Sequence, residues 1–326
     1  MNKPLVYVTR MLPQPAMDLL KQHCNAEINP DDRVLSKRQL LMKVKGKDAV
    51  LCLLTDTIDD EVFEAAGPQC RIFANYAVGF NNIDVSAATR RGIVITNTPG
   101  VLTDATADLA WALLFAVARR IVEADRYTRA GRFKGWAPML FLGQDITGRT
   151  LGVIGAGRIG SNFAKKACGF NMRVLYTDIR QNPEFEKETG ARFADLETLL
   201  GESDFVSIHV PLLPETRHLI SEKELRLMKK TAILINTSRG PVVDEKALVK
   251  ALREKTIFGA GLDVYENEPE LEPGLAELDN VVIVPHIASA TIETRTKMGL
   301  MAVENILAFF EGKIPPNIVN PEVMRR

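Results

Sequence analysis

Short apolar runs rich in β-branched residues alternate with segments of helical periodicity along the chain. The runs are LVYVTR (5–10), AVLCLL (49–54), RIFANYA (71–77) and IVITN (93–97), then TLGVIG (150–155), RVLYTD (173–178), FVSIHV (205–210), AILINT (232–237), GAGLDV (259–264) and VVIVPH (281–286). Near-continuous apolar strands separated by helices are typical of parallel sheets covered on both faces. The two sets of runs therefore predict two doubly wound α/β domains, Rossmann-like or flavodoxin-like.

Two longer segments indicate how the domains are connected. LAWALLFAVA (109–118) is uncharged but only about half as long as a membrane span requires, so it predicts a buried helix. Thr103 or Asp104 could cap its start. The last helical stretch, 292–311, follows the final strand of the second set and needs a surface to cover. We expect it to return to the first domain, which gives a substrate domain of residues 1–100 plus 290–326 around a dinucleotide-binding domain of residues 101–289.

Composition excludes several classes of partner. The 41 Lys and Arg residues balance 41 Asp and Glu residues, so no net field attracts nucleic acid or an anionic membrane. The N-terminus has no basic segment leading into an apolar h-region, so we expect a cytoplasmic protein. Four cysteines lack the paired spacing of a zinc site and are too few for a disulfide framework, so neither a metal nor disulfides are expected (Cys24, Cys52, Cys70 and Cys168). Small molecules are the expected partners.

A glycine motif follows the first strand of the second set. Gly155, Gly157 and Gly160 form G-x-G-x-x-G between a predicted strand and a predicted helix. The first glycine allows a tight turn, the second lets the backbone approach a pyrophosphate, and the third permits close helix packing. Phosphates there would face free N–H groups and the positive end of the helix dipole. The alternative is an ordinary glycine-rich turn.

An acidic residue in the next strand favours the dinucleotide site. Asp178 ends RVLYTD, 178 minus 155 or 23 residues after the first glycine, where an acid would bind a ribose diol. A carboxylate there would repel a 2′-phosphate, so NAD(H) is favoured over NADP. Arg180 argues in the other direction, because a nearby arginine accommodates that phosphate, and NADP stays as the alternative.

Arg239 stands where a buried strand ends, in AILINTSRGPVVDE (232–245). Ligands of doubly wound sheets bind beyond the carboxyl ends of the strands. The planar fork of a guanidinium suits bidentate binding of a carboxylate. Arg239 is therefore a candidate for binding a carboxylate substrate; the alternative is a surface arginine in a solvated turn.

His286 is the candidate acid–base residue among four histidines. It follows VVIVP and precedes the small residues of IASAT, so it should project at the same carboxyl edge. A histidine that titrates near neutrality is a natural proton donor to a carbonyl. His23 and His218 are expected at the surface, and His209, inside a strand, is expected to be packed.

An acid that orients the imidazole would complete the set. The candidates are Asp263, at the end of GAGLDV, and Glu266 and Glu268, in YENEPELEP (265–273). The residues themselves leave this choice open.

Several motifs together resemble a known family. GAGRIG with Asp178, then NTSRGPVVDE, GAGLDVYENEP and PHIASAT, resemble the D-isomer-specific 2-hydroxyacid dehydrogenases, and the likeness covers nearly the whole chain. NYAVGFNNIDVSAATRRGIVITNTPGVLTDATADLA and GRFKGWAP resemble most the glyoxylate and hydroxypyruvate reductases. The resemblance implies two similar α/β domains with the active site in the cleft between them, and a homodimer formed through the nucleotide domain.

The resemblance also implies roles for individual residues. Arg239 would bind the substrate carboxylate and polarise the keto oxygen, and Glu268 would pair with His286. Backbone N–H groups at Val78 and Gly79 would meet the carboxylate from the other side. Beside the glycines and Asp178, the residues implied at the cofactor are Thr106, Arg158, Ile159, Val210, Pro211, Thr216, Thr237, Ser238, Asp263 and Ser289. Trp136 resembles a tryptophan that reaches a neighbouring subunit's site, with an interface or core aromatic as the alternative.

The implied activity is hydride transfer between NAD(H) and a short 2-oxo or 2-hydroxy acid. Reduction of glyoxylate or hydroxypyruvate to glycolate or D-glycerate is the first expectation. Dehydrogenases of D-lactate, D-glycerate or phosphite share the architecture and stay as alternatives. A corepressor-like scaffold that senses NAD is the alternative from another class. Since the chain ends soon after its last helix, we do not expect the regulatory domain of the longer phosphoglycerate dehydrogenases.

Overall fold

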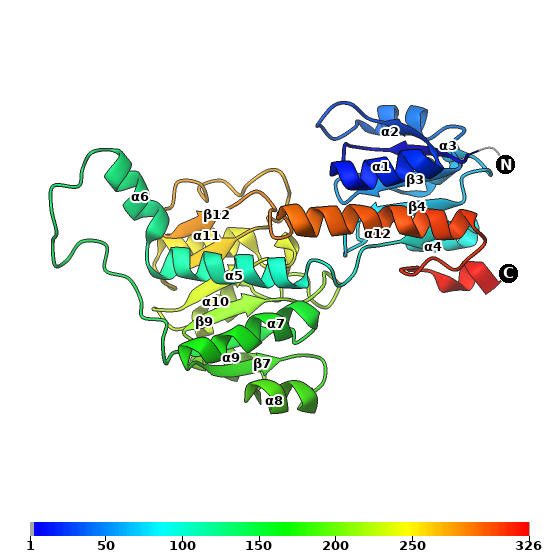
Figure 1. The fold of residues 1–326 in the computed structure, drawn as a ribbon. Coiled ribbons are helices and arrows are strands. Elements are labelled where there is room, and N and C mark those ends of the chain that lie inside the picture. Colours follow the sequence, from blue (N-terminus) through cyan, green and yellow to red (C-terminus); the bar gives the residue numbers. More distant parts are fainter. Residues whose placement is uncertain (1–2, 326) are drawn as a thin grey trace. The chain divides into compact units, whose positions relative to one another are not determined.

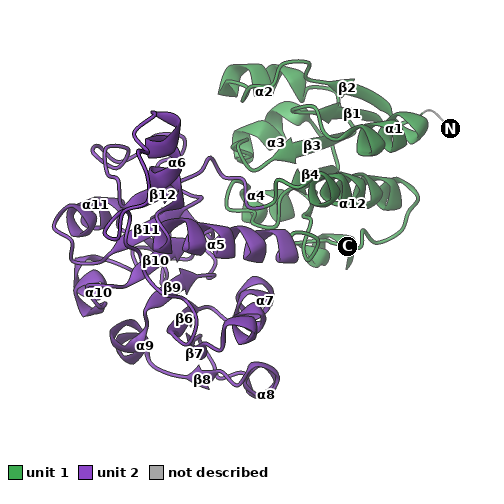
Figure 2. Ribbon diagram, turned by 60° about the vertical axis from the view of Figure 1, so that its left-hand side comes forward, with its two compact units in different colours: residues 1–102, 289–326 green, residues 103–288 purple. Residues whose placement is uncertain are grey.

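The computed structural model describes residues 3–325 and forms two compact units. Unit 1 comprises residues 1–102 and 289–326, and unit 2 comprises residues 103–288 (Figure 2). The chain thus enters unit 2 at the start of its long apolar helix and returns to unit 1 after the last strand. Each unit has one sheet with helices packed on it (Figure 1). Within residues 3–325, no helix is long and apolar enough to cross a membrane.

The sheet of unit 1 is fully parallel, in the order β2-β1-β3-β4-β5. Its strands are β1 (Leu5–Val8), β2 (Asn25–Ile28), β3 (Ala49–Leu53), β4 (Ile72–Tyr76) and β5 (Val94–Thr96). Its helices are α1 (Gln14–His23), α2 (Lys37–Lys43), α3 (Asp60–Ala66), α4 (Val85–Arg90) and α12 (Ile292–Phe310), with a short 3-10 turn, η3 (Pro321–Arg325). The sequence predicted four of these strands and missed β2.

Helix α12 covers unit 1 although it lies about 200 residues beyond that unit's last strand. It packs against α1 and β4 through Met298, Ala302 and Ile306, which are buried. Gly299 permits the approach, since a Cβ there would lie 2.7 Å from the Cβ of Ala16. Apolar burial on this face is what returns the end of the chain to unit 1.

The sheet of unit 2 is also parallel, in the order β12-β11-β10-β9-β6-β7-β8. Its strands are β6 (Thr150–Ile154), β7 (Arg173–Thr177), β8 (Arg192–Phe193), β9 (Phe205–Ile208), β10 (Ile233–Asn236), β11 (Gly259–Leu262) and β12 (Val281–Ile283). Its helices are α5 (Thr103–Ala118), α6 (Ile121–Arg129), α7 (Arg158–Lys166), α8 (Pro183–Thr189), α9 (Leu196–Glu202), α10 (Glu222–Leu227) and α11 (Glu245–Arg253), with 3-10 turns η1 (Ala167–Phe170) and η2 (Gly240–Val242).

The strand order of unit 2 reverses between β6 and β9. From β6 the chain runs outward through β7 to β8, then returns to β9 on the other side of β6. In doubly wound sheets a ligand binds beyond the carboxyl ends of the strands at such a reversal. The glycine motif follows β6, so the topology places it at this point.

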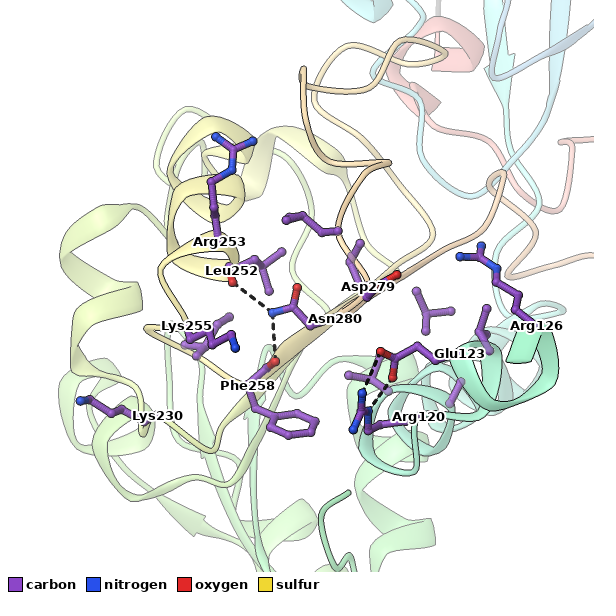
Figure 3. Close-up of a pocket in the computed structure, with 17 residues that line it drawn as sticks. Arg120, Glu123, Arg126, Lys230, Leu252, Arg253, Lys255, Phe258, Asp279 and Asn280 are labelled. Carbon is purple, nitrogen blue, oxygen red and sulfur yellow. Dashed lines mark hydrogen bonds and ion pairs between the residues drawn. The ribbon is translucent and has the colours of Figure 1, made fainter. Parts of the chain in front are cut away.

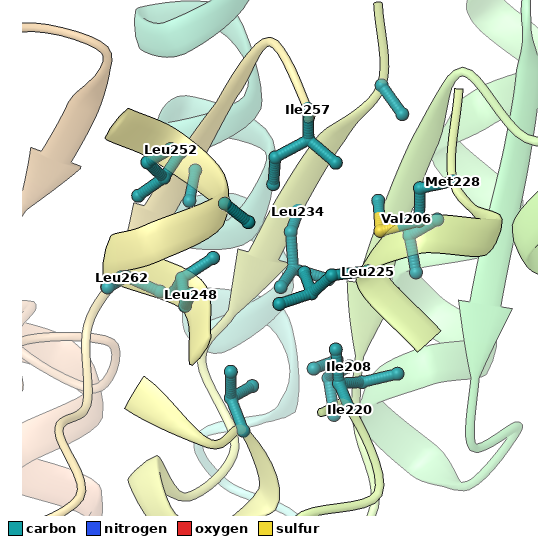
Figure 4. Packing of buried hydrophobic residues seen from close by; sticks show 14 of the residues in the cluster. Val206, Ile208, Ile220, Leu225, Met228, Leu234, Leu248, Leu252, Ile257 and Leu262 are labelled. Carbon is teal, nitrogen blue, oxygen red and sulfur yellow. The ribbon is translucent and has the colours of Figure 1, made fainter. Parts of the chain in front are cut away.

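The strands of unit 2 bury both faces, as their apolar runs predict. Leu234 packs into one cluster with helical Leu225 and Leu248 (Figure 4). Its neighbours Ile233 and Ile235 point to the other face and join a second cluster with α5 and α7. Since successive strand side chains alternate in direction, only a sheet with helices on both faces buries all three.

The long apolar helix α5 packs directly on β11. Gly261 makes this possible, because a Cβ there would lie 2.9 Å from the Cβ of Leu113. Residues on α5 that are buried include Ala110, Leu114 and Val117. The prediction that Thr103 or Asp104 caps this helix is wrong. The helix begins one or two residues earlier than expected, so that both residues lie within its first turn.

Candidate active site

Three candidate residues follow three neighbouring strands. Arg239, Asp263 and His286 come after β10, β11 and β12, which are adjacent and parallel. Their carboxyl ends therefore meet at one edge of the sheet. Backbone bonds link these segments laterally: the Asp263 N–H donates to the Asn236 carbonyl at 3.0 Å, and the His286 N–H donates to the Asp263 carbonyl at 3.0 Å.

The His286 imidazole contacts the Glu268 carboxylate. His286 Nδ1 lies 2.9 Å from Glu268 Oε2, and the Tyr265 N–H donates to Glu268 Oε1 at 3.1 Å. Burial would raise the pKa of Glu268, but the hydrogen bond and charge of His286, with help from Tyr265 N–H and Arg239, lower the pKa below its usual value. An ionised carboxylate only accepts, so Nδ1 is the donor and Nε2 stays available. Both side chains are partly open to solvent, 27% for His286 and 31% for Glu268.

Of the three acids left open by the sequence, Glu266 contacts a different histidine. Glu266 Oε1 accepts from His218 Nε2 at 2.6 Å and from the Arg217 guanidinium at 3.3 Å. His218, expected at the surface, is 38% exposed and takes part in this pair. His209 is packed as expected: its ring lies against Phe163, and burial lowers its pKa to about 3.

Asp263 holds the backbone that follows His286. Its carboxylate is fully buried and accepts N–H bonds from Ile287 at 2.6 Å and Ala288 at 2.9 Å. Burial raises the pKa of Asp263 in spite of these bonds and of the charge of His286. His286 itself has a φ of 53°, a left-handed conformation that costs a non-glycine residue roughly 1–2 kcal/mol. The bonds to Asp263 stabilise that conformation.

Asn236, which the sequence reasoning did not single out, shapes the turn that carries Arg239. The Asn236 side-chain amide donates to the Arg239 carbonyl at 3.0 Å, and its oxygen accepts from the N–H and hydroxyl of Ser238 at 3.0 and 2.8 Å. A buried polar residue closing an apolar strand was the available signal. Burial lowers the pKa of Arg239. Within residues 3–325 no carboxylate forms an ion pair with its guanidinium, which stays available to an anion.

Gly240 brings the loop of Arg239 against the loop of Glu268. A Cβ at Gly240 would lie 1.8 Å from the Tyr265 carbonyl oxygen and 2.5 Å from the Glu266 nitrogen. Such distances are far inside van der Waals contact. Only glycine therefore lets these two backbones pack directly.

The glycine loop has the shape that a pyrophosphate requires. Gly155 has a φ of 93°, and a Cβ at Gly160 would lie 1.9 Å from the Gly155 carbonyl oxygen. Gly157, at the N-cap of α7, has no heavy atom within 4 Å of a built Cβ. That open space is a cradle which a side chain would fill, so the loop fits a dinucleotide. Val210, after β9, lies over the turn, with Cγ1 2.8 Å from the Cβ position of Gly155.

Asp178 lies against the same loop. Its carboxylate accepts the Ala156 N–H at 2.7 Å and the Ile179 N–H at 2.7 Å. A carboxylate keeps further lone pairs for ribose hydroxyls. The structure thus joins the acid to the glycine loop, while the side chain of Arg180 is exposed.

Comparison with known proteins identifies the family. Residues 111–288 match the D-isomer specific 2-hydroxyacid dehydrogenase NAD binding domain. A glyoxylate reductase of Korarchaeum cryptofilum is 56% identical over 99% of this chain and 98% of its own. The chain belongs to the D-isomer-specific 2-hydroxyacid dehydrogenases. The predicted resemblance is confirmed.

Solved structures agree with this dehydrogenase in fold. A protein from Thermus thermophilus has 48% identity and a TM-score of 0.91, over 97% of this chain and 99% of its own. An NADPH-dependent glyoxylate/hydroxypyruvate reductase from Sinorhizobium meliloti, solved with NADP and malonate, has 30% identity and a TM-score of 0.86, over 100% of this chain and 99% of its own. The predicted fold class, two parallel-sheet α/β domains, is confirmed, and the NAD-binding domain of this dehydrogenase lies within unit 2.

The other residues expected at the cofactor of this dehydrogenase occupy unit 2, except one. Thr237 is buried, and within residues 3–325 its hydroxyl has no hydrogen-bond partner, so it is free to bind a ligand. Thr216 folds the segment after β9 by donating to the Pro211 carbonyl at 2.7 Å. Arg158 and Ile159 open α7, Thr106 is buried in the first turns of α5, and Ser289 belongs to unit 1.

Val78 and Gly79 follow β4 in unit 1, with both carbonyls bound by side-chain amides. Asn97 donates to the Val78 carbonyl at 2.8 Å, and Asn75 donates to the Gly79 carbonyl at 2.9 Å. Within the described chain, the N–H groups of Val78 and Gly79 donate to no protein acceptor. They are therefore available to an anionic ligand.

A pocket of about 580 Å³ lies elsewhere on unit 2 of the dehydrogenase. Asp279 and Asn280, just before β12, line it together with Arg120 and Glu123 from the start of α6 (Figure 3). His286 follows the other end of β12. Since ligands of these sheets bind beyond the carboxyl ends of strands, this pocket is not the candidate active site.

Proposed function

We propose that this dehydrogenase uses NADH to reduce a short 2-oxo acid, glyoxylate or hydroxypyruvate, to glycolate or D-glycerate. The observation that carries the proposal is the Glu268–His286 contact, on loops adjoining Arg239, whose guanidinium has no carboxylate partner within residues 3–325. Relatives that are 50–56% identical over nearly their full length carry the name glyoxylate reductase. Malonate, a small carboxylate, was bound to the Sinorhizobium meliloti reductase.

Arg239 binds the substrate carboxylate in this proposal. Its guanidinium offers two parallel N–H donors, which fix both the position and the orientation of a carboxylate. The charge of Arg239 also stabilises negative charge that develops on the keto oxygen. The free N–H groups of Val78 and Gly79 are the further donors that we assign to the substrate carboxylate.

His286 delivers the proton in this proposal. Nδ1 is bound to Glu268, so Nε2–H of the imidazolium is the group that protonates the keto oxygen. The Glu268 carboxylate stabilises the imidazolium and fixes the ring, as the acid of a catalytic triad does. When bound at the loop of Gly155, Gly157 and Gly160, NADH supplies the hydride that reduces the keto carbon. We assign the cofactor contacts to the residues predicted from the resemblance.

A panel of substrates tests the proposed function. Glyoxylate, hydroxypyruvate and pyruvate are assayed as oxidants of NADH and of NADPH, and phosphite as a reductant of NAD and of NADP. The rate is followed by the near-ultraviolet absorbance of the reduced cofactor. We expect the highest kcat/KM with glyoxylate or hydroxypyruvate. Faster turnover of pyruvate or phosphite would move the assignment to the corresponding alternative. Tight NADH binding with no turnover of any of these substrates would instead favour the corepressor-like scaffold.

Replacing Asp178 by alanine is expected to relax the preference for NADH. The carboxylate beside the glycine loop opposes a 2′-phosphate by a few kcal/mol, so its removal should lower the NADH to NADPH ratio of kcat/KM by about tenfold or more. Arg180→Ala is the matched variant, and it should raise the ratio or leave it unchanged. Wild-type protein that strongly prefers NADPH would contradict the electrostatic argument.

We further propose that the enzyme works as a cytoplasmic homodimer. The segment after α6 exposes large apolar side chains, among them Trp136 at 86% and Met139 at 75% (also Phe133 and Leu142). This exposure excludes the core alternative for Trp136 and provides a surface that a second copy would cover. In analytical ultracentrifugation the wild-type protein should sediment as a dimer, and Trp136→Asp should dissociate at higher protein concentration than the wild type does. A monomeric wild type would contradict the proposal.

The cysteines support the proposed cytoplasmic location. They are free thiols, three of them buried, which fits a reducing compartment.

A further inference from the structure

Glu245 forms the base of the loop that carries Glu268. It is the first residue of α11, and it is only 4% exposed. Its Oε2 accepts the Glu266 N–H at 2.7 Å, and its Oε1 accepts the Glu272 N–H at 3.1 Å. These two amides stand two residues before and four residues after Glu268. One carboxylate therefore closes the segment 266–272 at both ends.

Two further contacts fix the same segment. The exchange with Glu266 is reciprocal, since the Glu245 N–H donates to Glu266 Oε2 at 3.3 Å. Within the segment, Asn267 and Glu270 form a β-bridge that tightens the turn. The segment is thus a short closed loop whose position is set by α11, the helix that follows the Arg239 turn.

The chemistry of the Glu245 site is specific for a carboxylate. Within residues 3–325 no lysine or arginine forms an ion pair with Glu245, and the hydrogen-bond donors to its carboxylate are the main-chain N–H groups of Glu266 and Glu272. Two donors converge on it, and only a side chain with two acceptor oxygens satisfies both. Glutamine would turn its NH₂ group toward one of the amides and leave that buried donor unpaired.

We propose that Glu245 is the positioning residue for the acid–base pair: it holds the loop that presents Glu268 to His286. This inference rests on the proposed function, because Glu245 acts through that pair: its hydrogen bonds go to the backbone of the loop that carries Glu268. Buried carboxylates weaken stability unless they are fully hydrogen-bonded. The gain here is a fixed distance between Glu268 and an imidazole on a different loop, since misplacement by about 1 Å costs up to about 100-fold in rate.

A double-mutant cycle on kcat tests the proposal. Glu245→Gln should lower kcat for glyoxylate by about 10- to 100-fold in otherwise wild-type protein. In a Glu268→Gln background the same change should alter kcat less than about twofold, because the group it positions is gone. Glu270→Gln, an exposed acid of the same loop, is the matched control and should leave kcat unchanged in both backgrounds. Equal losses in the two backgrounds would show a merely structural role and overturn the proposal.

Hydrogen exchange provides a readout that does not depend on activity. The amides of Glu266 and Glu272 should lose protection in Glu245→Gln and keep it in Glu270→Gln. If Glu245→Gln does not fold, Glu245→Asp is used in its place, because aspartate keeps the charge and withdraws the carboxylate by one methylene. In that variant the protection of the Glu266 and Glu272 amides and kcat should fall together. Unchanged protection or full activity overturns the positioning role alone. If the wild-type protein turns over no 2-oxo acid, the proposed function is overturned. The catalytic role of Glu245 falls with it, even if hydrogen exchange shows that Glu245 holds the loop.

Discussion

Replacement of His286 by alanine is expected to lower kcat for glyoxylate reduction by about 10²- to 10⁴-fold, the usual contribution of a positioned general acid. The loss should fall on kcat, because the proton is needed only when the keto oxygen becomes an alkoxide. Binding of NADH, measured by fluorescence titration, should stay within about twofold of wild type, since the glycine loop follows β6 and not β12.

His23→Ala is the matched control for this variant. His23 is an exposed histidine at the end of α1 in unit 1, so its removal should leave kcat unchanged. Near-normal turnover in His286→Ala would remove this residue as the proton donor. Equal losses of kcat in His286→Ala and His23→Ala would indicate that the substitutions perturb the protein generally and that the loss does not report proton transfer.

Arg239→Ala is expected to impair the use of substrate more than the binding of cofactor. Two hydrogen bonds to a carboxylate contribute roughly 1.5–3 kcal/mol each, so kcat/KM for glyoxylate should fall by about 10²- to 10⁴-fold. Steady-state kinetics over a wide range of glyoxylate concentration measure this loss. Among residues 3–325, the hydrogen bond that the Arg239 guanidinium donates is to the Ser238 carbonyl, while Asn236 holds the turn through the Arg239 main chain, so the fold should persist.

Arg239→Lys separates charge from geometry at the same position. A lysine keeps the positive charge but loses the planar fork, so it should recover only part of kcat/KM. Arg226→Ala, an exposed arginine on α10 paired with Glu222, should leave the kinetics unchanged. Normal kcat and KM in Arg239→Ala would contradict the assignment of the carboxylate to Arg239.

Sequence patterning was sufficient for most strands and insufficient for two at sheet edges. The predicted runs all correspond to observed strands because strands buried on both faces must be apolar throughout. β2 (Asn25–Ile28) and β8 (Arg192–Phe193) lie at the ends of their sheets, where one edge is unpaired and burial is low. Their residues therefore carry little apolar signal, and only pairing with β1 and β7 makes them strands.

The choice among acids shows where local sequence stops being informative. Asp263, Glu266 and Glu268 lie within six residues of one another, and spacing could not assign them. In the structure they have three different partners: the backbone after His286, the His218–Arg217 pair, and the His286 imidazole. The resemblance implied Glu268 for the last place, and its role there stays a prediction until the variants are measured.

The sequence by itself determined the class of the sheets, the glycine loop with its acid, and the strand ends that carry Arg239 and His286. These depend on short-range rules, since apolar period, glycine spacing and the direction of parallel strands can be read along the chain. Only the tertiary structure decided which carboxylate faces His286 and that Glu245 closes the loop of Glu268. The His286–Glu268 contact joins residues 18 positions apart, and the contacts of Glu245 join residues 21 and 27 positions apart. Their distances depend on how separate strands and helices pack.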